Sequence, residues 1–176
     1  MTAIRPYREA DEAAVVALWQ ACGLTRPWNP PAADIAFARS SGHGELFLAE
    51  DAGEIVGSVM VGHDGHRGWV YYLAAAASRR QEGLGRRLMA AAEEWLTARG
   101  VRKCELMIRS SNEAAAGFYA RLGYDREPVL VMSRWLDGTE RKPVSAEIQE
   151  SPVTPAEAGV QGNEPVAPPG FPLSRE

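Results

Sequence analysis

The stretch Arg80-Gln-Glu-Gly83-Leu-Gly85 combines residue types that can hold an anion. It follows an apolar run and opens a segment of helical periodicity, so we expect it at the first turn of a helix. The N–H groups of that turn lack partners within the helix, and the helix dipole places positive charge there. Gly83 and Gly85 leave the backbone open to a ligand, and four arginines add positive charge nearby: Arg79, Arg80, Arg86 and Arg87. The expected ligand is a pyrophosphate.

Two other phosphate motifs do not match this spacing. A P-loop needs Gly-Lys followed by Ser or Thr, and the chain has no such sequence. A dinucleotide fingerprint needs a third glycine three residues after Gly85, where Leu88 stands. A nucleotide-binding protein of another class is therefore a distant alternative.

A second pattern follows one helix and one strand later, with Asn112, Phe118-Tyr119 and Gly123-Tyr124 in fixed order. In this order the two motifs resemble the signatures of the GNAT superfamily of N-acyltransferases, Gln/Arg-x-x-Gly-x-Gly/Ala and Asn-x-x-Ala-x-x-Phe-Tyr-x-x-x-Gly-Phe/Tyr. The resemblance covers about residues 2–138. Stretches 26–29 and 64–68 are also similar to the small bacterial YpeA-like branch. Gln81 departs from the glycine common at its position, and the alanine run 74–77 replaces a usual valine and proline.

The resemblance implies acetyl-CoA as co-substrate and an α/β fold with a mixed, mostly antiparallel sheet. Its central parallel strands, the fourth (69–75) and the fifth (103–108), would splay apart around the pantetheine arm, flanked by helices. Backbone groups of Leu73 and Ala75 would bind that arm, and an N–H near Leu73 would polarise the thioester carbonyl. Asn112 would contact the pantetheine. The pyrophosphate would be held by Arg80, Gln81, Glu82, Gly83, Leu84, Gly85 and Arg86.

The resemblance also makes Tyr119 the candidate acid that protonates the leaving thiolate, although its helical spacing alone is typical of a core tyrosine. The attacking amine must be neutral, and no base stands out among Glu45, His63, Asp64 and His66. Candidate acceptor-site residues are Trp28, Asn29, Asp64 and His66. The sequence His63-Asp64-Gly65-His66 contains metal-ligand types, but a turn is the favoured interpretation, and we expect no metal.

Composition limits the partners. The chain has 176 residues, 45% hydrophobic and 24% charged, with a net charge of −4. Nucleic-acid binding relies on a basic field, so nucleic acid is an unexpected partner. Residues 1–10 lack the apolar core of a signal peptide, and no apolar run reaches the length of a membrane span. We expect a cytoplasmic protein without membrane contact, with an amine acceptor as partner and a homodimer as an open alternative.

Two segments are expected from the composition. Seven of the twelve prolines follow Gly138. With one aromatic residue, Phe171, that part cannot bury enough apolar surface to offset its ordering entropy. We therefore expect an N-acetyltransferase domain over 1–138 and a Pro-rich, disordered tail over 139–176.

The pattern of the first segment predicts alternating strands and helices. Expected strands cover 3–7, 46–49, 55–61, 69–74, 103–108 and 129–135, with 69–74 buried on both faces. Expected helices begin at Asp11, Asp34 and Gly83, and a fourth begins at a capping box of Ser110 and Glu113.

The leading interpretation is an acetyl-CoA-dependent N-acetyltransferase that moves the acetyl group to a primary amine by direct attack in a ternary complex. One alternative is a non-catalytic acyl-CoA-binding or sensor module of the same fold. Another is an acyltransferase that uses longer acyl groups.

Overall fold

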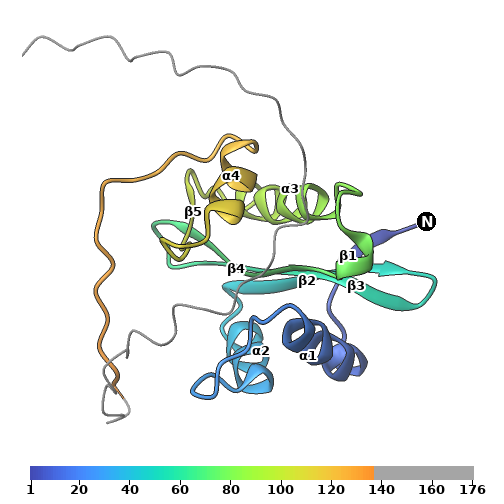
Figure 1. Cartoon of the computed structure of the whole chain (residues 1–176). Helices are drawn as coiled ribbons and strands as arrows, with labels where there is room; N and C mark the ends of the chain where they lie inside the picture. The colour runs from blue at the N-terminus through green and yellow to red at the C-terminus, as the bar shows by residue number, and fades with distance from the viewer. Residues whose placement is uncertain (137–176) are drawn as a thin grey trace, which may run out of the picture. The chain divides into compact units, whose positions relative to one another are not determined.

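A computed structural model describes residues 1–136 of the chain. The chain divides into residues 1–127 and 128–176, and the expected boundary after residue 138 lies outside the described residues. The first unit contains a five-stranded sheet covered by helices on both faces (Figure 1). Its elements are β1 (Ala3–Pro6), a 3-10 turn (Glu9–Asp11), α1 (Glu12–Ala21), α2 (Pro31–Ser40), β2 (Gly44–Asp51), β3 (Glu54–His63), β4 (Gly68–Ala75), a 3-10 turn (Ala77–Arg79), α3 (Leu84–Thr97), β5 (Cys104–Leu106) and α4 (Glu113–Ala120).

The strands lie in the order β1-β2-β3-β4-β5, and every neighbouring pair is antiparallel except β4 and β5. The parallel ladder begins at Gly68 opposite Cys104 and ends at Val70 opposite Leu106, whereas β4 continues to Ala75. Beyond Val70 the two strands are no longer paired. The expected mixed sheet with splayed parallel strands is therefore confirmed.

The core has two parts, one on each face of the sheet. On one face α3 buries an apolar stripe against β2, β3 and β4, and on the other face α1 and α2 do the same (Figure 1). The buried residues of α3 are Leu84, Leu88, Met89, Ala92, Trp95 and Leu96, at the spacing predicted for one helical face. Because α3 is fixed along its whole length, its first turn has a defined position above β4.

Several expected elements differ in the structure. The second helix begins at Pro31 and not at the expected Asp34. The strand expected over 103–108 is three residues long. The strand expected to be buried on both faces includes Tyr71, which is 42% exposed. The fourth helix is capped by Asn112, whose side-chain oxygen accepts from the N–H of Ala115 at 3.1 Å, and not by Ser110. Asp11 precedes α1, but its carboxylate binds Arg5 and the N–H of Arg8 instead of capping the helix.

The strand expected over residues 129–135 is wrong, because the structure has neither strand nor helix from 128 to 136. The apolar run at 129–132 predicted a strand, but β propensity depends on packing against neighbouring residues and does not by itself form one. The tail expected over 139–176 lies outside the described residues. Within residues 1–136, no helix is long and apolar enough to cross a membrane.

Candidate cofactor pocket and active site

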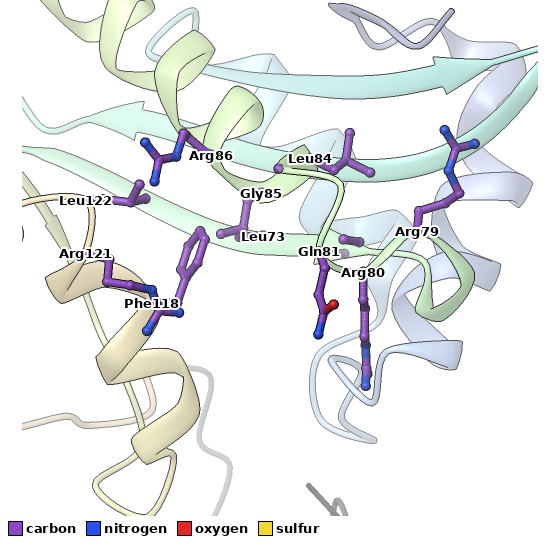
Figure 2. Close-up of a pocket in the computed structure, with 13 residues that line it drawn as sticks. Leu73, Arg79, Arg80, Gln81, Leu84, Gly85, Arg86, Phe118, Arg121 and Leu122 are labelled. Atoms are coloured by element: carbon purple, nitrogen blue, oxygen red, sulfur yellow. The ribbon is translucent and has the colours of Figure 1, made fainter. Parts of the chain in front are cut away.

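A pocket of about 430 Å³ opens at the first turn of α3 (Figure 2). Its wall comes from three places in the chain. These are the far end of β4, the turn that leads into α3 with the first residues of that helix, and the end of α4 with the two residues that follow it. It is lined by Leu73, Ala74, Ala75, Arg79, Arg80, Gln81, Gly83, Leu84, Gly85, Arg86, Phe118, Arg121 and Leu122. The pocket thus adjoins the part of β4 that continues beyond the β4–β5 ladder.

The predicted cofactor residues divide between the wall of this pocket and other places. Eight of them line it: Leu73, Ala75, Arg80, Gln81, Gly83, Leu84, Gly85 and Arg86. Glu82, Asn112 and Tyr119 are not part of the wall, and neither are the candidate acceptor residues Trp28, Asn29, Asp64 and His66. The structure therefore gathers the predicted pyrophosphate residues except Glu82 in one wall, but not the predicted acceptor residues.

The turn before α3 requires its glycines. Gly83 is the N-cap residue of α3 with φ 73°, a left-handed conformation that glycine adopts without strain, and no side chain caps the helix. A Cβ on Gly85 would lie 3.1 Å from Cζ of Phe118, so Gly85 allows α3 and α4 to approach closely. The N–H groups of the first turn therefore have no side-chain partner at the N-cap, and groups of this kind can donate hydrogen bonds to an anion.

The four arginines near this turn differ in the groups that they contact. Arg79 lies between Asp51 at 2.7 Å and Glu82 at 2.8 Å, so its charge is already neutralised. The carboxylate of Glu82 points toward Arg79 because the two side chains form this ion pair. Arg87 donates to the backbone oxygen of Thr2 at 2.6 Å and is not part of the pocket wall. The expectation that all four arginines add charge at one spot is therefore wrong for Arg79 and Arg87.

Three pocket arginines have no ion pair within residues 1–136: Arg80, Arg86 and Arg121. Figure 2 shows Arg80 beside Gln81 on one side of the pocket, and Arg86 and Arg121 toward the side of Phe118 and Leu122. Their charges are available to an anionic ligand.

Substitution of adjacent arginines should separate these roles. We expect Arg80→Gln to weaken acetyl-CoA binding severalfold at low salt, with a smaller effect at high salt because ions screen exposed charges. We expect Arg79→Gln to lower the melting temperature through the loss of its bonds to Asp51 and Glu82, with a smaller effect on affinity. Calorimetric titration and thermal melting of both variants measure this difference. The reverse pattern would contradict the assignment.

Tyr119 lies on α4 between two aromatic rings, with centroid distances of 5.0 Å to Phe118 and 5.7 Å to Tyr124. Burial raises the pKa of its phenol to about 12. Its hydroxyl makes no hydrogen bond within residues 1–136, whereas the hydroxyl of Tyr124 donates to Glu93 at 2.7 Å. Tyr119 is thus a protonated phenol whose hydroxyl is not hydrogen-bonded to any other group within residues 1–136.

The predicted acceptor residues lie in turns. Asp64 accepts from the N–H groups of His66 at 2.8 Å and Arg67 at 2.7 Å, and these bonds hold the pKa of its carboxyl well below its usual range. A carboxylate so stabilised is a weak base. Trp28 is 49% exposed. The turn spans Asp64 to Arg67, since His63 is still part of β3.

Two further candidate bases, Glu45 and His63, contact groups close to them in the fold. The carboxylate of Glu45 accepts from the N–H of Leu46 at 2.9 Å, and the ring of His63 packs edge-on against His43 at 4.9 Å. No group of three His, Cys, Asp or Glu side chains within residues 1–136 could hold a metal ion.

Sequence reasoning missed part of the wall at the end of α4. Phe118 of α4 lines the pocket together with Arg121 and Leu122, which directly follow the end of the helix at Ala120. In the sequence, these residues have the spacing i, i+3, i+4. A basic residue between two apolar ones at that spacing is the signal that could have identified Arg121.

Comparison with known proteins agrees with this geometry. The model of the Acetyltransferase (GNAT) family matches residues 12–124. The chain belongs to the GNAT acetyltransferase family. An acetyltransferase of Pectobacterium atrosepticum is 44% identical over 135 residues, which are 76% of this chain and 94% of that protein. An acetyltransferase of Yersinia enterocolitica is 42% identical over the same shares. The finer likeness to the YpeA-like branch stays a prediction.

Solved structures show the same fold. The aminoglycoside acetyltransferase AAC(6')-Iy, in complex with a bisubstrate analogue of CoA, has a TM-score of 0.66 and 20% identity over 77% of this GNAT chain and 98% of its own. A transcriptional regulator from Bacillus halodurans has a TM-score of 0.64 and 21% identity over 77% of this chain and 100% of its own. At this identity the likeness concerns the fold alone.

Proposed function

We propose that this GNAT protein binds acetyl-CoA and transfers the acetyl group to a primary amine by direct attack in a ternary complex. The observation that carries the proposal is the continuity of the pocket. Its wall runs from the proposed anion site at Gly83 and Gly85 to Leu73 and Ala75, on the part of β4 that is no longer paired with β5. An elongated ligand with phosphates at one end and a thioester at the other fits this arrangement.

The residues around the pocket fit the charge and the length of CoA. The free N–H groups of the first turn of α3, with Arg80 and Arg86 beside them, offer donors and positive charge to a pyrophosphate. Leu73, Phe118 and Leu122 offer apolar surface to the pantetheine arm. Asn112 uses its side-chain oxygen as the cap of α4, so only its amide nitrogen is left for a ligand.

The proposed reaction balances as a simple aminolysis. The amine nitrogen forms a bond to the thioester carbonyl carbon while an N–H of the chain stabilises the developing oxyanion. The C–S bond then breaks, and Tyr119 gives its proton to the leaving sulfur. The amine nitrogen loses one proton, which returns through water to the phenolate. Fixing both reactants in one site supplies much of the rate, because a bimolecular step becomes a positioned attack.

The test is release of free thiol from acetyl-CoA in the presence of separate amines: an aminoglycoside, a polyamine, a lysine peptide and a peptide with a free N-terminus. We expect thiol release with at least one class, together with an acetylated amine of the expected added mass. Tyr119→Phe is the matched control for enzyme-independent aminolysis. Tight binding of acetyl-CoA without transfer to any amine would instead favour the non-catalytic sensor.

A further inference from the structure

β4 contains a strained residue beside the pocket. Tyr72 has φ 50°, a left-handed conformation that side chains rarely adopt. At this point the register between β3 and β4 shifts, because Ser58 pairs with Ala74 while Met60 pairs with Tyr71. Tyr72 and Leu73 are therefore left without a partner in β3. Such strain persists only where the surroundings enforce it.

Ser58 on β3 is the centre of the contacts that hold Tyr72 in its left-handed conformation. It is the buried polar side chain of the described core, with an exposed fraction of 0%. Its hydroxyl accepts from Nε1 of Trp19 at 2.8 Å and donates to the backbone oxygen of Tyr72 at 3.0 Å. The hydroxyl is thus satisfied in both directions, and the second bond fixes the peptide between Tyr72 and Leu73.

The side chain of Tyr72 is fixed as well. Its ring stacks on Trp19 with centroids 3.9 Å apart and 11° between the planes. Its hydroxyl donates to Asp34 of α2 at 2.5 Å. Because ring, hydroxyl and carbonyl are all held from the α1 and α2 side, this peptide has little freedom to rotate.

The direction of the next N–H follows from peptide geometry. In a trans peptide the carbonyl and the N–H point in opposite directions, and the described residues contain no cis peptide. The carbonyl of Tyr72 points to Ser58 on β3, so the N–H of Leu73 points away from β3. On that side β5 has already ended at Leu106, and Leu73 lines the pocket.

We propose that Ser58 is a positioning residue, which turns the N–H of Leu73 toward the thioester carbonyl of acetyl-CoA. The inference rests on the proposed function and extends it to a residue outside the pocket. Ser58 does not touch the ligand. It acts by holding the carbonyl at the other end of the same peptide, so that the donor is oriented before the ligand binds.

The test compares acetyl-CoA with S-ethyl-CoA, a thioether analogue that lacks the carbonyl oxygen. One hydrogen bond corresponds to about a three- to tenfold preference for acetyl-CoA, and calorimetric titration should show it for the wild-type protein. In Ser58→Ala we expect that preference to vanish while the affinity for S-ethyl-CoA stays within about twofold. Trp19→Phe is the matched control, because it also removes a buried hydrogen bond of Ser58, leaves the bond from Ser58 to Tyr72 intact, and keeps an aromatic ring that can stack on Tyr72. It should keep the preference.

Each outcome decides the proposal. An equal loss of affinity for both ligands in Ser58→Ala would mean a structural role only and would overturn it. A wild-type protein that binds both ligands equally would also overturn it, while CoA binding itself would stand. Binding of neither ligand would remove the proposed function and the inference together. Should Ser58→Ala fail to fold, Ser58→Cys keeps a weaker donor at similar volume, and an undiminished preference in that variant would overturn the proposal.

Discussion

Replacement of Gly83 by glutamate is expected to abolish acetyl-CoA binding. The new carboxylate would stand at the N-cap of α3, where the free N–H groups would hold the pyrophosphate. A like charge at such a site costs several kcal/mol, and each roughly 1.4 kcal/mol is a tenfold change in affinity. We therefore expect the dissociation constant to rise by about 100-fold or more, as measured by calorimetric titration.

The control for this variant is Gly53→Glu. Gly53 has φ 84° in the turn between β2 and β3, with open space around it, and it is not part of the pocket wall. Glutamate at either position meets the same backbone strain, so both variants should lose some stability. Only Gly83→Glu should lose the ligand. Normal affinity in Gly83→Glu would remove the assignment of this turn as the pyrophosphate site.

Tyr119→Phe is expected to lower kcat about 100-fold or more, which is the contribution typical of a general acid. The affinity for acetyl-CoA should stay within about twofold, because the substitution keeps the ring that packs between Phe118 and Tyr124. Steady-state kinetics with an identified amine, together with direct titration of the ligand, give the two quantities separately.

Tyr124→Phe is the matched control for Tyr119. Its hydroxyl is committed to Glu93, so its loss should reduce stability and leave turnover largely unchanged. If both variants, or neither, lose turnover, Tyr119 is not the specific acid. The raised pKa of Tyr119, about 12, adds a pH test. The phenol is protonated below that value, so no falling limb from this group should appear up to about pH 10.

The glycine turn could be predicted from the sequence because local rules decide it. Two glycines after an apolar run and before a helical stripe leave few alternatives to an open helix N-terminus. The stripe from Leu84 to Leu96 likewise fixed the face of α3. The splayed strands came from the family resemblance, since no local pattern shows where a parallel ladder ends.

Other features depend on long-range contacts that a sequence does not display. Arg79 and Arg80 are adjacent and equally charged, yet Asp51 at the end of β2 neutralises only Arg79. Ser110 and Asn112 both carry capping side chains, and the start of α4 decides between them. The role inferred for Ser58 requires Trp19 from α1 and the register shift in β4, neither of which a strand pattern reveals.

The residues that would bind the acceptor amine are hard to predict for the same reason. Trp28 and Asp64 have suitable side chains in irregular segments, but the structure places neither in the pocket wall. Loop positions of this kind carry no periodicity from which a common face could be deduced.

Thermal melting of the full chain with acetyl-CoA, ATP and NAD in parallel tests the central claim most directly. A ligand at about 100 times its dissociation constant adds ~2.7 kcal/mol to the free energy of unfolding. We predict a clear rise in melting temperature with acetyl-CoA and little change with ATP or NAD. An unchanged melting temperature at millimolar acetyl-CoA, or an equal rise with all three ligands, would contradict the assignment of the pocket to CoA.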